Sequence, residues 1–259
     1  MLEQYKPSLA KLYKNYYRHV FDDTTGLINK YIHLSGAKDI TKRNSAFYDN
    51  VVFWKTTQLA QKLGIIAKNK QYLADLKNRI IHTFWYAEGG YFLEDLSNEC
   101  IKNNYYSSDW LIAIMTGFLS LDVPGERAYI EKSISYIRKE KIDKPFPLRY
   151  QQDDRAQRQF ALVKYLIPEY GGTIIGSHWG IEYCKVLLML SKHTKNTAYI
   201  HEAHKFLGMY KNNIETYKGF PEVYYSDGKM VQGALYTSVR QTGWVVNFEQ
   251  ALAMSDNLS

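Results

Sequence analysis

Apolar side chains recur every three or four positions along most of this chain, which is the period of an amphipathic helix. Between residues 46 and 63, for example, Val51, Trp54, Leu59 and Leu63 follow this spacing, and Gly64 stands where helices commonly end. The same pattern predicts helices at residues 8–21, 46–63, 68–86, 107–120, 125–140, 154–166, 177–192, 195–213 and 239–255. We therefore expect an all-α chain with little strand.

The segments between these helices alternate between short turns and long loops. Asp122–Gly125 is a plain turn, whereas the longer loops contain Gly, Pro, Trp, Tyr and charged residues. A ring of α-hairpins would show this asymmetry, with its functional residues on one rim. The chain has no repeat of fixed length, which disfavours a regular solenoid.

Composition narrows the function classes only in part. The 259 residues are 46% hydrophobic and 23% charged, as in a folded globular protein. Aromatic residues make up 15% and include 23 Tyr, which suits a carbohydrate site but suits a Tyr-rich core equally well. The net charge is +7 without a dense basic run or a nucleic-acid-binding motif, so we expect no nucleic-acid partner.

The two cysteines indicate a reducing compartment. Cys100 and Cys184 are far apart and outside CxxC spacing, so we expect buried thiols and a cytoplasmic location. The sequence has no apolar run long enough to span a bilayer, and we expect no membrane association. Metal-ligand, phosphate-loop and nucleophile-elbow motifs are absent, so no metal or cofactor is expected.

One carboxylate lies among aromatic residues near the C-terminal end. The loop Gly219–Gly228 reads Gly-Phe-Pro-Glu-Val-Tyr-Tyr-Ser-Asp-Gly and places Glu222 close to Tyr225. Sugars bind on aromatic faces, and a pair of carboxylates commonly hydrolyses glycosidic bonds. Glu222 is therefore a candidate acid or base of a glycosidase, and the alternative is a solvated charge on a surface turn.

A second polar segment, residues 33–50, precedes a predicted helix. Its candidate ligand-binding residues are Lys38, Asp39, Arg43, Tyr48, Asp49 and Asn50. Nearby cations would favour the ionised form of Asp39, which suits a base, whereas a general acid needs burial. For Asp49 and Asn50 the alternative is a structural hydrogen-bond network.

Two further segments place aromatic side chains beside polar ones. In residues 103–110, Tyr106 and Trp110 are candidates for a sugar subsite, while Asp109 serves either the chemistry or an ordinary helix cap. In residues 171–180, glycines precede His178 and Trp179, which suggests sugar contact or aromatic packing at a helix start.

Together these motifs resemble the six-hairpin, (α/α)6-toroid glycoside hydrolases. Tyr91–Phe92 after a double Gly, the Gly/His/Trp helix start, and Phe220–Tyr225 are similar to motifs of neutral/alkaline invertases, where the last reads Trp-Pro-Glu-Tyr-Tyr-Asp. Ser35–Asp39 is similar to the Ser-Gly-Trp-Asp signature of trehalases and processing α-glucosidases. Lys38 stands where that signature has Trp.

This resemblance implies a function and a fold. It implies an inverting glycosidase for an α-glucosidic bond of a small sugar or oligosaccharide, with Glu222 as base and Asp39 as acid, and Asp49 and Asp109 as rival acids. The residues expected to hold the sugar are Tyr91, Tyr106, Trp110, His178, Trp179 and Tyr225. Residues 1–259 would form a single toroid domain that lacks some N-terminal hairpins, equivalent to the C-terminal two-thirds of a full toroid.

Other interpretations of the sequence stay open. A non-catalytic carbohydrate-binding or truncated toroid would keep the aromatic residues without a working acid. A helical scaffold could bind another protein through its rim, and a toroid lyase or epimerase would depend on Tyr or His. The expected partner is a carbohydrate, and the sequence leaves open whether the chain forms a homo-oligomer.

Overall fold

The computed structural model of the chain describes residues 2–31, 41–153, 162, 165, 169–233 and 236–258. These residues are mostly helical, as the hydrophobic pattern predicts. The α-helices are α1 (Leu2–Val20), α2 (Phe47–Lys62), α3 (Lys70–Phe84), α4 (Asn98–Asn103), α5 (Ile112–Met115), α6 (Pro124–Lys139), α8 (Ser177–Thr194), α9 (Thr197–Tyr217) and α10 (Val245–Asp256). The helix expected at 154–166 lies outside the described residues, apart from positions 162 and 165. Within the described segments, no helix combines the length and hydropathy needed to cross a membrane.

Short antiparallel strand pairs follow some of the helices. They are β1 (Phe21–Asp22) with β2 (Leu27–Ile28), β3 (Trp85–Tyr86) with β4 (Tyr91–Phe92), and β5 (Ile175–Gly176) with β6 (Val223–Tyr224). The first two pairs are hairpins directly after α1 and α3, and each turns through a glycine of positive φ, Gly26 (+67°) and Gly90 (+74°). The third pair joins distant parts of the chain, with Ile175 opposite Tyr224.

Capping residues explain several helix boundaries. The side chain of Asn69 accepts a hydrogen bond from the backbone N–H of Tyr72 and so starts α3. Pro124 occupies the first turn of α6, where its missing N–H costs nothing. Gly64 follows α2 with φ +67°, which confirms the predicted glycine at that helix end.

The segment predicted as one helix at 107–120 is instead broken. A 3-10 helix, η1 (Ser108–Leu111), leads into the short α5, and the side chain of Ser107 makes no cap hydrogen bond. The Ser108 hydroxyl donates to the carbonyl of Arg149 at 2.5 Å. The alternative that Asp109 is an ordinary helix cap is therefore wrong, because its side chain and that of Ser108 make long-range contacts.

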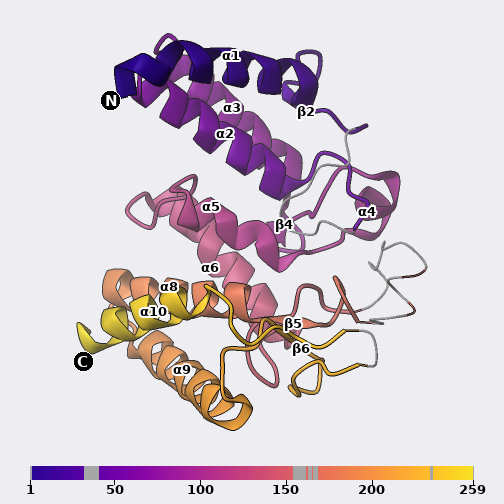
Figure 1. Ribbon diagram of the computed structural model, residues 1–259, viewed down its shortest axis with the longest axis vertical. Coiled ribbons are helices and arrows are strands. Elements are labelled where there is room, and N and C mark those ends of the chain that lie inside the picture. Colours follow the sequence, from indigo (N-terminus) through magenta and orange to yellow (C-terminus); the bar gives the residue numbers. More distant parts are fainter. Residues whose placement is uncertain are drawn as a thin grey trace.

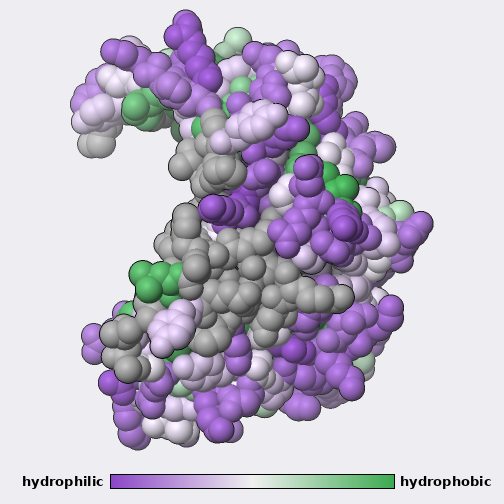
Figure 2. Space-filling model, turned by 90° about the vertical axis from the view of Figure 1, so that its right-hand side faces the viewer, coloured by the Kyte–Doolittle hydropathy of each residue, from purple (hydrophilic) through white to green (hydrophobic). Residues whose placement is uncertain are grey.

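The helices form a stack of layers with loops gathered along one side (Figure 1). α2 packs on α3 near the N-terminus, and α8 packs on α9 and α10 near the C-terminus, with α5 and α6 between. The strands β2, β4, β5 and β6 all lie at the same side, which we call the rim. Figure 2 looks onto this rim and shows an outline that is indented on one side below the N-terminal helices.

One large buried cluster of apolar side chains extends from Val20 to Ala251 and includes residues from α2, α3, α6, α8, α9 and α10. Cys184 belongs to this cluster, and Cys100 lies in a small neighbouring one with Tyr105. Both cysteines are buried free thiols, as predicted. The core therefore links the layers and holds the rim loops on a common support.

Candidate functional site

Backbone hydrogen bonds tie the rim loops to one another in sequence. Each loop donates to or accepts from the next: Leu96 N to Asn44 O (2.7 Å), Glu94 N to Tyr105 O (2.8 Å), Ser108 N to Tyr150 O (2.9 Å), Tyr150 N to Ile174 O (3.1 Å), Ser177 N to Glu222 O (3.0 Å) and Glu222 N to Val239 O (2.9 Å). The last contact explains why α10 starts later than the expected 239, because residues 239–241 pair with the Glu222 loop instead. Segments far apart in sequence thus hold one another in register along the rim.

A buried ion-pair cluster lies within this rim. Nη1 of Arg43 forms an ion pair with Oδ2 of Asp109 and lies 3.7 Å from Oε1 of Glu94, and all three side chains are at most 1% exposed. Nε2 of Gln151 donates to the other oxygen of Glu94 at 2.7 Å. Burial by itself lowers the pKa of Arg43, but the charges of Asp109, Glu94 and Asp49 outweigh it and raise that pKa. Among the described residues, Arg43 therefore faces the carboxylates of Asp109, Glu94 and Asp49.

The pKa values of two tyrosines near the cluster are raised, in part by its carboxylates. The pKa of Tyr48 is raised by burial first and then by the charges of Asp109 and Asp49. The pKa of Tyr150 is also raised, by burial first and then by neighbours that include both Glu222 and Asp109. The backbone of Tyr150 bonds to Ser108 and to Ile174, and Ser177 bonds to Glu222, so Tyr150 lies between the Arg43 cluster and the Glu222 loop on the rim.

Glu222 is half-buried on this rim. Its backbone is fixed on both sides by the hydrogen bonds to Ser177 and Val239. Its Oε2 accepts a hydrogen bond from the hydroxyl of Tyr236 at 3.5 Å. Burial and then the charge of Glu222 raise the pKa of Tyr236 to about 12, so Tyr236 stays a proton donor at neutral pH. The carboxylate is therefore oriented while keeping some access to solvent.

His178 and Trp179 lie beside Glu222 at the start of α8. The edge of the Trp179 ring meets Tyr48, with ring centroids 6.3 Å apart at 84°, and its indole N–H donates to Tyr150. The preceding glycine is required here, because a Cβ on Gly176 would lie 2.9 Å from the ring of Tyr150. The glycine thus lets the backbone approach the ring of Tyr150 closely.

Three predicted sugar-binding residues lie in the core instead. Tyr91 and Tyr106 pack edge to face at 5.6 Å, and the indole N–H of Trp110 donates to the Tyr106 hydroxyl at 3.1 Å. Trp110 is 1% exposed and Tyr106 is 0% exposed. Because their rings and polar atoms contact protein, we leave these three residues out of the proposed site.

The remaining predicted residues have separate surroundings. Asn50 is buried and bonds the backbone of Ile28 and Ala46, which is the network role that the sequence left open. Asp49 is partly exposed near Arg43 and Tyr48, where its charge is felt. Tyr225 packs beside a small cluster of Ile174, Val223 and Val231. Lys38 and Asp39 lie outside the described residues.

Several residues of the rim were missed from sequence. They are Glu94, Tyr150, Gln151, Tyr236, Trp244 and Asn247. Glu94 lies two positions after β4, and nothing in its local sequence distinguishes it from a carboxylate on a surface turn. Tyr236 and Gln151 likewise carry no local signal, because their roles depend on contacts across the fold.

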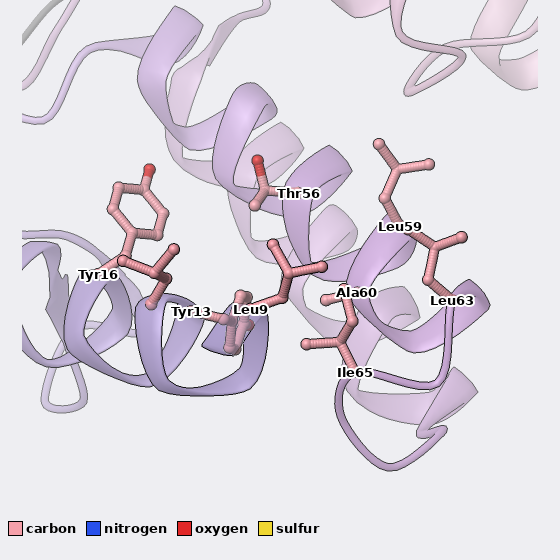
Figure 3. A pocket seen from close by; sticks show the side chains of 9 residues that line it. Leu9, Tyr13, Tyr16, Thr56, Leu59, Ala60, Leu63 and Ile65 are labelled. Carbon is pink, nitrogen blue, oxygen red and sulfur yellow. The ribbon is translucent and has the colours of Figure 1, made fainter. Parts of the chain in front are cut away.

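A groove between α1 and α2 is a rival site (Figure 3). It has a volume of about 330 Å³ and is lined by Leu9, Leu12, Tyr13, Tyr16, Thr56, Leu59, Ala60, Leu63 and Ile65. The labelled side chains of both helices point toward the same space, and they are mostly aliphatic. No carboxylate, His or Lys lines the groove, so it lacks the groups that acid–base chemistry requires.

Among the described residues, no group of three or more His, Cys, Asp or Glu side chains is arranged to hold a metal ion.

No protein-family model matches the chain, and no curated protein sequence matches it either. The function has therefore to be inferred from the residues of the rim and their geometry.

Proposed function

We propose that the chain is an inverting glycoside hydrolase that acts on an α-glucosidic bond of a small sugar or oligosaccharide. In this proposal the stacked helical layers belong to an (α/α)6 toroid, and the rim is its active face. The observation that carries the proposal is the placement of Glu222. It is a half-buried carboxylate, oriented by Tyr236, beside His178, and on the same part of the rim as the buried Arg43 cluster.

Glu222 would act as the general base. Its orientation by Tyr236 and its partial exposure suit a carboxylate that takes a proton from a water molecule. That water attacks the anomeric carbon as the glycosidic bond to the leaving oxygen breaks, and the configuration inverts. In inverting enzymes the two carboxyl groups lie roughly 6.5–9.5 Å apart, which leaves room for the water.

Asp39 would act as the general acid that protonates the leaving oxygen. Support for this assignment comes from the sequence and from Arg43, which lies a few residues further along the chain and is anchored in the rim. Asp49 is the remaining rival, because it is partly exposed in the same region. Asp109 is poorly suited, because its carboxylate is buried against Arg43 and turned away from solvent.

The Arg43 cluster would stabilise the transition state by its charge. The transition state of glycoside hydrolysis has oxocarbenium character and therefore develops positive charge. In this proposal the carboxylates of Asp109, Glu94 and Asp49, which meet at Arg43, supply the negative potential that this developing charge requires. Fixed charge of this kind, held in a low-dielectric setting, needs no rearrangement during the reaction.

Replacement of the base tests the proposal. Glu222→Gln keeps the size of the side chain and removes the proton acceptor, so we expect turnover of an α-glucoside panel to fall about 10²- to 10⁴-fold. Sugar binding, measured by calorimetry, should stay within a few-fold of wild type. The matched control is Glu215→Gln, the same change at an exposed position of α9, which should leave both unchanged. Equal turnover for Glu222→Gln and wild type would remove Glu222 from the mechanism.

A non-catalytic carbohydrate-binding domain is the second candidate. The observation in its favour is that Asp109, one of the three candidate acids, is buried in an ion pair. Such a domain would bind the same sugars through Glu222, His178 and Trp179 without turning any of them over. Wild-type binding without turnover across the panel would select this candidate.

A further inference from the structure

Beyond the Glu222 site, a row of aromatic rings runs outward along the rim. It starts at Tyr48 and Trp179 and continues through His178, whose ring lies 4.7 Å from that of Trp179. The His178 ring also packs against Trp244 in a tilted arrangement, with centroids 4.3 Å apart and an interplanar angle of 32°. Trp244 is the most exposed of these rings, with 37% of its surface accessible. The row therefore ends in an indole that keeps contact with solvent.

Backbone contacts keep Trp244 close to Glu222. The segment before Trp244 pairs with the Glu222 loop, because Phe220 N donates to Arg240 O at 2.7 Å and Thr242 Oγ1 donates to Phe220 O at 3.3 Å. His178 in turn follows Ser177, whose backbone N–H donates to Glu222 O. Both rings of the outer pair are thus held by the same loops that hold the proposed base.

The hydrogen bonds around His178 define its tautomer. Nδ2 of Asn247 donates to Oε1 of Glu182 at 3.0 Å, and because a carboxylate oxygen only accepts, the amide nitrogen must face that side. The same Nδ2 lies 3.4 Å from Nδ1 of His178, so Nδ1 accepts and the proton of the neutral ring sits on Nε2. Lys185 completes the chain by donating to Oε1 of Glu182 at 3.0 Å.

His178 stays neutral, which matters for its choice of ligand. Burial first, and then the charge of Lys185, lower its pKa to about 4. Within the described part of the chain the Nε2–H has no acceptor. The pair therefore offers an uncharged N–H donor beside an exposed indole face, a combination that matches a neutral sugar with its apolar face and its ring of hydroxyl groups.

We infer that Trp244 and His178 form an outer sugar subsite, so that the substrate is an oligosaccharide whose second or third unit stacks on Trp244. This inference rests on the proposed function, because it extends the same rim from Glu222. A hydroxyl group of that sugar unit accepts from Nε2–H of His178. Chain length, and not only the linkage at the cleaved bond, then determines how well a substrate is used.

The test compares α-linked gluco-oligosaccharides of two, three and four units. For wild type we expect kcat/KM to rise with length, and for Trp244→Ala we expect a loss of roughly three- to tenfold on the longer substrates, mainly through KM. The loss on the two-unit substrate should be smaller. Trp244→Phe should keep most of the wild-type kcat/KM on the longer substrates, because it retains an aromatic ring. The control Val246→Ala shortens an exposed apolar side chain in the first turn of α10, two positions after Trp244, and should change neither kcat/KM nor its dependence on chain length.

Sugar binding to Glu222→Gln, measured by calorimetry, separates the subsite inference from the hydrolase proposal. If wild type does not turn over any sugar but longer chains bind more tightly and lose this gain in Trp244→Ala, the subsite stands and the hydrolase proposal fails. If wild type turns sugars over and Trp244→Ala acts equally on all lengths or on none, the subsite is overturned. Absence of any sugar binding to the folded protein would overturn both.

Discussion

The rim around Glu222 and the groove between α1 and α2 both present side chains to solvent, but they differ in what they bury. The rim holds Arg43, Glu94 and Asp109 almost without exposure, and removing charged groups from water is unfavourable unless partners compensate. The groove holds aliphatic side chains such as Leu12, which is 63% exposed, and Leu59, which is 41% exposed.

This contrast favours the rim as the reactive surface. Buried charges orient neighbouring groups and create a local potential, and at the rim burial and Lys185 lower the pKa of His178. In the groove the raised pKa values of Tyr13 and Tyr16 come first from burial. In the groove the polar groups are few, and the hydroxyl of Tyr13 already pairs with Thr57 at 2.8 Å. The groove is lined mainly by aliphatic side chains that suit packing, whereas the rim carries the charged and polar side chains that catalysis requires.

The largest expected effect comes from removing the cation of the rim. Arg43→Met removes the guanidinium that pairs with the buried carboxylates of Asp109 and Glu94, so the free energy of unfolding should fall by about 3–5 kcal/mol. Urea unfolding measures this loss. The control is Arg127→Met, which breaks a half-exposed pair with Glu131 and should cost about 1 kcal/mol or less. Similar losses in both variants would show that the cluster has no special role.

His178 should make stability depend on pH in a defined window. Its pKa lies near 4 in the folded chain against 6.5 ordinarily, so between these values the unfolded chain binds a proton that the folded chain does not. The stability that comes from keeping the ring neutral is complete above pH 6.5 and is lost as the pH falls toward 4, and the full loss amounts to about 3 kcal/mol.

Urea unfolding at pH 7 and pH 4.5 tests this window. Wild type should lose more stability on acidification than His178→Gln, which cannot take up the proton. His82→Gln, a change at an exposed position of α3, should behave like wild type. An identical acid dependence for wild type and His178→Gln would show that the ring is not held neutral by the fold.

A smaller effect is expected from the hydroxyl that orients Glu222. Tyr236→Phe removes the hydrogen bond to Oε2, and about 1 kcal/mol of stabilisation of the carboxylate with it. In the proposed mechanism the acidic limb of the kcat/KM profile should then move to higher pH, because the base is protonated more readily. A profile that keeps its shape and position would separate Tyr236 from the chemistry.

The smallest effect belongs to the groove. Leu12→Ala shortens a mostly exposed side chain, so the free energy of unfolding should change by about 0.5 kcal/mol or less, and turnover should not change. Thermal unfolding and the α-glucoside assay measure the two. A tenfold fall in turnover for this variant would reverse the comparison and assign the function to the groove.

The sequence predicted the helices better than the site. Periodic apolar residues locate α2 and α3 to within a few positions, because the core selects one face of each helix. The roles of the aromatic residues were harder to predict, because Tyr106 and Trp110 would show the same local sequence pattern in a core as in a sugar subsite. Only the tertiary contact of Trp110 with the Tyr106 hydroxyl separates the two.

Residues of the buried cluster show why the rest was out of reach. Asp109 has the local sequence of a helix cap, yet it pairs with Arg43, 66 positions away. Glu94 has the local sequence of a surface turn, yet it is 1% exposed and bonded to Gln151. Such pairings depend on how the layers stack, which local spacing does not encode.

The anomeric configuration of the first product tests the central claim most directly. Proton NMR, recorded within minutes of mixing the protein with sucrose, trehalose, maltose or a short α-glucan, distinguishes α- from β-glucose before they interconvert. Sucrose is the decisive substrate, because its one glucose unit is the unit that is attacked, whereas trehalose also releases its leaving glucose as the α-anomer. From sucrose we expect β-glucose first with wild type, and no product in the same time with Glu222→Gln. Initial release of α-glucose from sucrose, or no turnover of any of these sugars by the folded protein, would contradict the account.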